Sequence, residues 1–503
     1  MKVVTAGRSL GGVLLRTLRA VCLLLGVCIF LPATGHAASA GSIFTLWPLV
    51  DYRSAPQDKF SSLGLAGPLL RYEKSEKRTR FGLRPLYYRA TDEKGGVESD
   101  LLYPLMTYRS SEEGSSFQFF HLLTSDVSAE EGSDFMLFPF LFYRNPPQGE
   151  GYFAFFPLGG KILNRFGRDR IEFALFPLYG KTERKGTETT NLLWPFFSLT
   201  RGEEERGWAF WPLYGTAKKK GVYRRSFLLW PFFFHADERL DSSDPLHTRA
   251  FFPFFYFADS PTRTDHTYLW PFFSHIEDAR KDVEEWNFPW PIFRVIDGKD
   301  RQMLRLLPFY SDDRTAKLHE RWRLWPLYKD EESFSPTYTS QRQRVLYFLY
   351  SNTKEQFVGE ERPYRHRIDL WPFFTFEEKD GLSHFSTLAL LEPFFPGNEQ
   401  IERNWSPLWR IYQRRWDHAG NEASTFLWNL YWKERRGDDL LFELFPLISY
   451  RDEKSQQKFE LALLKGLYRY TKKSDQVCSY LFYLPWGWCY PSQRFMAPVK
   501  ESL

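Results

Sequence analysis

Short apolar runs recur along the chain, and most of them are centred on a proline. The run Leu192-Leu193-Trp194-Pro195-Phe196-Phe197 is typical, and Leu229-Trp230-Pro231-Phe232-Phe233 repeats it. Counted from the proline, the even positions are aromatic residues or leucine, whereas position +3 is glycine, serine or charged. An apolar face of period two, rich in aromatic residues, predicts a strand. A helix is a poor alternative, because a proline in each run would break it at about 3 kcal/mol.

The runs form an internal repeat. Aligned on the proline, 24 copies lie between Pro48 and Pro485 at a mean spacing of 19 residues, and 20 of them keep the proline. Segments such as Glu183-Arg184-Lys185-Gly186 and Lys379-Asp380-Gly381 separate the copies, and glycine beside a polar residue is typical of hairpin turns. The sequence therefore predicts an all-β protein of about 24 antiparallel strands. The motif Leu/Phe–Trp/Phe–Pro–Leu/Phe–Phe/Tyr is expected at the centre of each strand.

These strand centres are expected to supply the core of the repeat. Their Trp-Pro pairs are Trp47-Pro48, Trp194-Pro195, Trp211-Pro212, Trp230-Pro231, Trp270-Pro271, Trp325-Pro326 and Trp371-Pro372. Tryptophans at equivalent positions could instead line a surface on which sugar or lipid rings stack. We favour packing, because a binding site rarely needs so many copies of its anchor.

Three architectures account for such an array. An up-and-down barrel in a membrane explains an even strand number and aromatic girdles, but a proline in nearly every strand would remove a donor that lipid cannot replace. A soluble closed β-repeat shell or propeller-like array explains the prolines better and the girdles less well. A parallel solenoid conflicts with repeat spacings that vary from 14 to 24 residues. We favour the barrel.

The start of the chain is typical of a cleaved secretory signal. Four basic residues precede an apolar run at 20–31, and Ala38-Ser39-Ala40 supplies the small residues that signal peptidase needs. No linker rich in proline, glycine or serine divides the remainder. We therefore expect a signal peptide at 1–40, one β-repeat domain at 41–490 and a disordered tail at 491–503.

This arrangement of export signal, strand length and aromatic girdles resembles bacterial outer-membrane β-barrel proteins. No motif is specific to one barrel family, so the resemblance assigns no functional residue. It implies a non-enzymatic cell-envelope protein with a structural or transport role, located in the outer membrane with lipid as its partner. The alternative is a soluble periplasmic or surface scaffold that binds glycan, lipid or envelope protein through its loops or aromatic rows.

Charge and composition narrow the class further. Removal of a signal with four basic residues takes the formal net charge from +5 to +1, and both signs of charge are mixed through the loops. A nucleic-acid-binding protein would show a basic face, so we expect no nucleic-acid partner. Aromatic residues make up 19% of the chain, yet no stretch after the signal reaches the roughly 18 apolar residues of a membrane helix.

Cys478 and Cys489 are the cysteines that remain after the signal. They flank Leu484-Pro485-Trp486, so we expect a disulfide across the last hairpin in an oxidising compartment. A metal-binding pair is the weaker interpretation, because no histidine lies near them in the sequence.

Sequence motifs of catalysis are absent. There is no Gly-rich phosphate loop, His-Glu-x-x-His, Cys-x-x-Cys or Gly-x-Ser-x-Gly, so we expect no enzyme activity, cofactor or metal. His235 and His275 both stand four residues after a proline, two repeats apart, and a metal pair would require their strands to stack. We interpret them as rim histidines, and acidic clusters such as Glu203-Glu204-Glu205 as solvated loops.

Overall fold

A computed structural model describes residues 42–55, 59–360, 363–474 and 476–491 of the chain. Within these ranges, 46 strands of four to eight residues form one sheet. Each strand pairs antiparallel with the next strand along the chain, which confirms the predicted all-β, antiparallel, up-and-down arrangement. The expected signal peptide and almost all of the expected tail lie outside the described residues.

The strands of the first part of the sheet are β1 (Ser42–Leu46), β2 (Val50–Ala55), β3 (Phe60–Leu65), β4 (Leu70–Lys74), β5 (Arg78–Leu83), β6 (Tyr87–Asp92), β7 (Val97–Leu101), β8 (Met106–Ser110), β9 (Gly114–Phe119), β10 (Leu123–Ser128), β11 (Gly132–Leu137), β12 (Leu141–Asn145), β13 (Tyr152–Phe155), β14 (Gly159–Arg165), β15 (Arg168–Ala174) and β16 (Tyr179–Arg184). Those of the middle part are β17 (Thr187–Leu192), β18 (Phe197–Arg201), β19 (Glu205–Phe210), β20 (Tyr214–Lys219), β21 (Tyr223–Leu228), β22 (Phe233–Glu238), β23 (Leu246–Phe251), β24 (Phe255–Ser260), β25 (Arg263–Tyr268), β26 (Phe273–Asp278), β27 (Val283–Asn287), β28 (Phe293–Gly298), β29 (Arg301–Leu306), β30 (Tyr310–Thr315), β31 (Leu318–Arg323) and β32 (Tyr328–Phe334). Those of the last part are β33 (Tyr338–Val345), β34 (Tyr350–Phe357), β35 (Arg365–Leu370), β36 (Phe374–Lys379), β37 (Leu382–Thr387), β38 (Tyr412–Asp417), β39 (Glu422–Phe426), β40 (Tyr431–Arg436), β41 (Asp439–Leu444), β42 (Ile448–Glu453), β43 (Lys458–Leu463), β44 (Tyr468–Lys473), β45 (Gln476–Leu481) and β46 (Trp488–Pro491). The described helices are α2 (Glu399–Asn404) and the 3-10 turns η2 (Ser406–Leu408), η3 (Lys454–Gln456) and η4 (Leu464–Gly466).

The repeated proline lies in a turn and not at the centre of a strand. Around Pro195, β17 ends at Leu192, residues 193–196 form the turn, and β18 begins at Phe197. A repeat therefore supplies two strands, which differs from the predicted one strand per repeat and total of about 24. The physical reason is that proline has no N–H to give to the ladder, and a turn is the place where that donor is not needed.

The connections at the two ends of the strands differ in composition. All connections that carry the repeat motif lie in one row of strand ends, which we call the proline rim. The connections between them lie in the row at the opposite strand ends, which we call the charged rim. The predicted polar turns Lys185-Gly186 and Asp380-Gly381 are on the charged rim, with positive φ at both residues of each turn. The proline rim consists of residues 47–49, 66–69, 84–86, 102–105, 120–122, 138–140, 156–158, 175–178, 193–196, 211–213, 229–232, 252–254, 269–272, 288–292, 307–309, 324–327, 346–349, 371–373, 388–411, 427–430, 445–447, 464–467 and 482–487.

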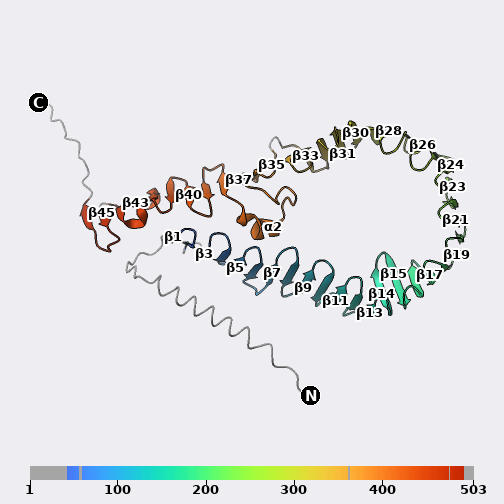
Figure 1. Cartoon of the computed structure of the whole chain (residues 1–503), viewed down its shortest axis with the longest axis horizontal. Helices are drawn as coiled ribbons and strands as arrows, with labels where there is room; N and C mark the ends of the chain where they lie inside the picture. The colour runs from blue at the N-terminus through green and yellow to red at the C-terminus, as the bar shows by residue number, and fades with distance from the viewer. Residues whose placement is uncertain (1–41, 56–58, 361–362, 475, 492–503) are drawn as a thin grey trace, which may run out of the picture.

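The sheet curves into an elongated loop (Figure 1). It runs from β1 along one side, turns back between β19 and β24, and returns so that its last strands lie opposite its first strands. In the part of the chain that the structure describes, no strand pairing joins β46 to β1, so the sheet is not closed by backbone hydrogen bonds. The closed barrel that the sequence suggested is therefore not confirmed.

Each side of the sheet keeps a constant face along the loop. Asp51 of β2, Arg71 of β4 and Thr425 of β39 line one cavity, although β2 and β39 lie on opposite sides of the loop. The face that carries these residues is therefore the inner face, and the continuous register extends it through every strand. A small apolar core covers this face at β12 to β15; it contains Phe142, Tyr152, Ala154, Ile162 and Phe173.

An insertion in the proline rim between β37 and β38, residues 388–411, joins the two sides of the loop, and we call it the clasp. It contains α2 and η2 and lies between the two sides of the loop (Figure 1). Arg403 pairs with Asp100 of β7 at 2.6 Å and with Glu98 at 2.8 Å. Asn404 also donates to Asp100, at 2.8 Å. These contacts span about 300 residues of sequence, and side chains make all of them.

Direct packing of the first strands on the last ones completes this contact region, which we call the seam. Trp47 Nε1 donates to the Leu427 carbonyl at 2.7 Å, and Asn429 Nδ2 donates to Asp51 at 2.8 Å. The Arg53 guanidinium lies 5.0 Å from the ring centroid of Trp432, whose side chain is fully buried. The seam is therefore two sheet layers deep, whereas the rest of the loop is a single layer.

Candidate functional site

The proline rim is an almost continuous edge of exposed apolar side chains. Trp194 is 53% exposed, and Trp230, Trp270 and Trp325 are about half exposed. The residue after each of these prolines is also apolar and exposed, for example Phe196. Soluble proteins rarely leave a contiguous apolar surface of this extent without a partner.

The turns of this rim place leucine in a conformation that leucine disfavours. Leu193, Leu229, Leu269 and Leu324, two residues before a proline, have φ between 43° and 51°. Glycine or asparagine adopts this left-handed region at much lower cost, about 1–2 kcal/mol less for each residue. All four leucines are about half exposed, so packing within the chain accounts for only part of each side chain. The repeated use of an exposed leucine here indicates that its side chain has a role outside the chain.

The backbone of the rim is hydrogen-bonded from one turn to the next. The Trp194 amide donates to the Pro177 carbonyl at 2.8 Å, and the Trp230 amide donates to the Pro212 carbonyl at 2.7 Å. The amide of Leu193 likewise donates to the Leu178 carbonyl at 2.8 Å. These bonds give the carbonyls of Pro177 and Pro212 partners within the protein, and in the intervening turns the residue after the proline, such as Phe196, accepts the bond. The bonded backbone groups of the rim can therefore enter an apolar medium without losing their partners.

Aromatic rings link neighbouring turns. Ring centroids are 5.8 Å apart between Trp211 and Trp230, and 5.7 Å apart between Phe176 and Trp194. Distances of this size are typical of favourable aromatic pairs. The rim thus behaves as one connected band and not as separate loops.

The outer face adds a second apolar row directly beside the rim. Cross-strand register connects its members: each residue pairs with the next in the row. Between β17 and β26 the row consists of Leu192, Phe197, Phe210, Tyr214, Leu228, Phe233, Phe251, Phe255, Tyr268 and Phe273. On the inner face at the same level stand Asn191, Ser198, Ala209 and Gly215. Apolar side chains therefore cover the rim and the adjacent outer face, whereas the inner face at this level mixes polar or small residues with the aromatic residues Phe227, Phe234 and Tyr256.

The inner face carries ion pairs further along the loop. Arg301 binds Asp313 through two hydrogen bonds of 2.9 and 2.7 Å. Arg344 lies 3.0 Å from Glu331. The bond with Asp313 raises the pKa of Arg301, although burial acts in the opposite direction. This part of the inner face is suited to contact water or polar groups.

The residues predicted as the core of the repeat divide into two groups. Trp194, Trp230, Trp270 and Trp325 project from the rim and are about half exposed. Trp47, Trp211 and Trp371 are more buried, and the Trp371 indole N–H donates to the Leu390 carbonyl at 3.2 Å. The prolines that follow them, Pro48, Pro195, Pro212, Pro231, Pro271, Pro326 and Pro372, all lie in rim turns, each after a cis peptide bond.

The remaining predicted pair, Cys478 and Cys489, forms a disulfide between β45 and β46. The two residues are direct cross-strand partners, with Cα atoms 4.1 Å apart.

His235 and His275 do not lie together. His235 is on β22, between Ser226 and Arg249 in the sheet, whereas His275 is on β26, between His266 and Trp286. The structure therefore does not form the conceivable metal pair.

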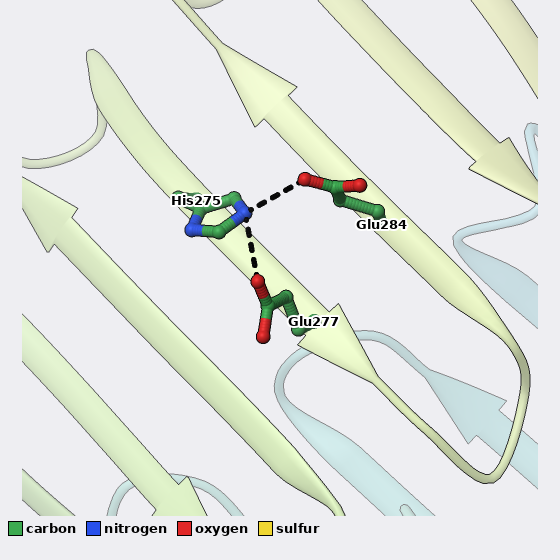
Figure 2. A group of neighbouring side chains, drawn as sticks. All are labelled: His275, Glu277 and Glu284. Carbon is green, nitrogen blue, oxygen red and sulfur yellow. Dashed lines mark hydrogen bonds and ion pairs between the residues drawn. The ribbon is translucent and has the colours of Figure 1, made fainter.

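His275 instead belongs to a small surface cluster with Glu277 and Glu284 (Figure 2). Its Nε2 lies 3.4 Å from Glu277 Oε1 and 3.2 Å from Glu284 Oε1, and its ring stacks on Trp286. Hydrogen bonds from the Trp286 indole and from His275 lower the pKa of Glu284. It is the one group of three metal-ligating side chains in the described residues. Because both carboxylates are more than half exposed and Glu284 already accepts hydrogen bonds from His275 and Trp286, we interpret it as a hydrogen-bonded surface cluster.

Sequence reasoning missed the function of the irregular repeats. Gly67 and Arg84 stand where a rim aromatic residue is expected, and Glu392 does the same in the clasp. In the structure all three belong to the seam: the ring of Trp428 covers Gly67, Arg84 donates to the Arg403 carbonyl, and Glu392 is fully buried. Departures from the motif are therefore the feature of the sequence that marks the parts of the sheet that meet at the seam.

Comparison with models of known protein families finds no match, and neither does comparison with curated proteins. Among the helices that the structure describes, none has the length and apolar character to cross a membrane.

Proposed function

We propose that this protein is a non-enzymatic scaffold of the cell envelope that inserts its proline rim into one leaflet of a membrane. The observation that carries this proposal is the rim itself, an exposed apolar edge with turn-to-turn backbone hydrogen bonds. Lipid is then the partner that covers the exposed tryptophans and leucines. The export signal expected at the start of the chain favours the outer membrane as the location.

The dimensions of the sheet favour one leaflet over a complete crossing. A strand of six residues, such as β17, extends over about 20 Å. The apolar part comprises the turn and the adjacent outer row, which together measure about 10 Å. A bilayer has a hydrocarbon core of about 30 Å, so this depth fits within a single leaflet of about 15 Å. A barrel that spans the bilayer would require a longer apolar wall.

The polar surfaces fit the same orientation. With the proline rim in lipid, the charged rim points into water, and the ion pairs of the inner face stay within the loop. The exposed indoles of the rim turns then lie at the inserted end, about 10 Å below the headgroups, and the apolar outer row lies between them and the headgroups. The loop would thus stand on the membrane as a ring-shaped wall.

Vesicle flotation tests the proposal. The protein is purified in detergent, mixed with phosphatidylcholine vesicles and centrifuged through a density gradient after washes with carbonate and urea. We expect the wild-type protein to float with the vesicles after both washes. In the variant Phe232→Ser/Phe272→Ser/Phe373→Ser, three exposed rim side chains are removed. At about 1 kcal/mol for each half-exposed phenylalanine, the partition coefficient should fall about 100-fold.

A matched control separates the rim from general apolar exposure. The variant Leu240→Ser/Val358→Ser/Leu382→Ser removes three exposed apolar side chains at or beside the charged rim. It should bind vesicles as the wild-type protein does. Equal losses in both variants, or recovery of the exported wild-type protein in the soluble periplasm, would contradict insertion of the rim.

A further inference from the structure

The seam encloses a cavity of about 480 Å³ between the inner faces of the first strands and β38–β39. Seven arginines and three acidic residues line it, so its walls carry an excess of positive charge. The acidic residues are Asp51, Glu73 and Glu402. Buried arginine is ordinarily matched by carboxylates or by an anionic ligand.

The carboxylates do not balance the arginines evenly. Arg71 and Arg80 share Glu73, at 2.6 and 3.5 Å. Arg84, which is half-buried, and Arg415, which is exposed at the mouth of the cavity, have no carboxylate within ion-pair distance among the described residues. Arg84 donates only to backbone carbonyls, and burial together with repulsion from Arg71 lowers its pKa to about 10.

Other arginines of the cavity have buried nitrogen atoms without a partner. Arg410 is only 5% exposed, yet its Nε has no hydrogen-bond partner in the described structure. The Nε of Arg403 is in the same state. Both side chains have carboxylate partners outside the lining, at Glu392 and Asp100. Their guanidinium groups are thus held in place by those partners while the Nε donors remain available.

We propose that this cavity binds the phosphate group of an anionic ligand. Phosphate accepts several hydrogen bonds at once, and arginine offers planar, two-pronged donors that match its oxygens. The cavity is much larger than a phosphate ion, so the ligand carries a further polar part such as glycerol or a sugar. Arg84 and Arg415 supply the charge that no carboxylate neutralises.

The position of the cavity indicates the source of the ligand. Its lining includes Trp47, Pro48 and Arg84, which belong to the proline rim. If the rim lies in lipid, as proposed above, this end of the cavity lies at the inserted edge, and the lining residues further along the strands, such as Arg415 of β38, lie nearer the membrane surface, where lipid phosphates are found. The choice of a lipid headgroup over a free phosphate rests on that proposal, whereas phosphate binding itself does not.

Calorimetric titration of the detergent-solubilised protein with glycerol 3-phosphate, and separately with inorganic phosphate, tests the site. We expect glycerol 3-phosphate to bind and the variant Arg84→Gln/Arg415→Gln to bind it at least about tenfold more weakly. The control Arg206→Gln/Arg224→Gln removes two exposed outer-face arginines and the same net charge, and it should bind as the wild-type protein does. Thermal unfolding of both variants without ligand checks that they are folded.

The outcomes separate the two proposals. Flotation with phosphatidylcholine vesicles that contain or lack phosphatidic acid should show tighter binding to the acidic vesicles, and the Arg84→Gln/Arg415→Gln variant should lose that preference. Equally tight binding of inorganic phosphate would support the site with a free phosphate as ligand. The rim variant should still bind glycerol 3-phosphate in detergent, even where it fails to bind vesicles. Absence of binding for both phosphates, or equal binding by both arginine variants, would overturn the inference.

Discussion

His384 shows how strongly a single residue of the seam depends on its surroundings. It lies on the inner face of β37, directly opposite Arg415 in the sheet. Burial lowers its pKa to about 3, with further lowering by Arg410, Arg415 and Arg367. Its buried Nε2 has no hydrogen-bond partner among the described residues. His384 is therefore a neutral imidazole surrounded by arginines.

We predict that this histidine makes the folded state sensitive to acid. In the unfolded chain a histidine takes up its proton near pH 6.5, whereas folded His384 does so only near pH 3. The free energy of unfolding is thus highest above pH 6.5, where His384 is neutral in both states, and it decreases as the pH falls towards 3. At pH 5 the free energy of unfolding should be about 2 kcal/mol lower than at pH 7.5 on this account. Urea unfolding at the two pH values measures it.

The variant His384→Gln should lose this part of the pH dependence. His266→Gln is the control, because His266 lies on the outer face beside Asp259. If the wild-type protein and His384→Gln have the same difference between pH 5 and pH 7.5, the histidine is already protonated in the folded state.

In the rim turn, the energetic cost of the backbone conformation can be measured separately from the contribution of the side chain to membrane binding. Leu229 and Leu213 are both 46% exposed on adjacent turns, but only Leu229 has a positive φ, of 47°. We predict that Leu229→Gly raises the free energy of unfolding by about 1 kcal/mol, because glycine relieves the left-handed backbone. The same change should weaken vesicle binding about fivefold, because one half-exposed leucine is lost.

Leu213→Gly provides the comparison for that turn. It should weaken vesicle binding by a similar factor, yet lower the stability, because its backbone has no positive φ to relieve. Chemical unfolding and flotation of both variants measure the two effects. A loss of stability in Leu229→Gly would mean that this leucine packs within the protein.

The same turn explains which part of the fold could be read from the sequence. The alternation around Pro195 identifies β structure correctly, since β17 and β18 each carry half of the pattern. It does not reveal the turn, because the apolar spacing continues through Leu193 to Phe196 without a polar residue. Turns are usually recognised by polar residues and glycine, and the polar turns that form the charged rim were predicted on that basis. An apolar turn becomes evident only when proline is weighed as a residue that strands exclude.

The closure of the whole molecule could not be predicted from the repeat. Asp100 and Arg403 are about 300 positions apart, and the periodic pattern contains no information about which copies meet. The irregular copies at Gly67, Arg84 and Glu392 marked the seam, but their pairing requires three-dimensional structure. The rows of tryptophans that form the proline rim could also be recognised in the sequence. Their exposure could not be predicted, because it depends on their location in turns and not at strand centres.

We predict that the clasp keeps the loop shut. Replacing residues 390–409 by a short Asn-Gly turn removes the contacts of Arg403 and Asn404 with Asp100. Each strand keeps its neighbours, so the far-ultraviolet circular dichroism should change little. The distance between spin labels at Lys77 and Asp438, on the charged rim at the two sides of the seam, should increase and its distribution should broaden.

Pulsed electron paramagnetic resonance measures that distance. As a control, the five-residue rim turn at 288–292 is shortened to three residues, which changes the rim far from the seam. This control should leave the distance between the labels unchanged. An unchanged distance after removal of the clasp would show that the packing of Trp47 and Trp432 closes the loop alone.

The lack of a strand pair between β46 and β1 has a consequence for how such a chain can change over generations. A barrel closed by hydrogen bonds must keep strand number and stagger consistent around the whole circle. Here each hairpin depends only on its two neighbours, and side chains of the clasp and of the packed strands at the seam complete the circle. Duplication of a coding unit for 19 residues adds two strands, about 10 Å of perimeter, without disturbing any existing register. The number of repeats in the gene therefore sets the size of the loop, which can change gradually by the gain or loss of repeats.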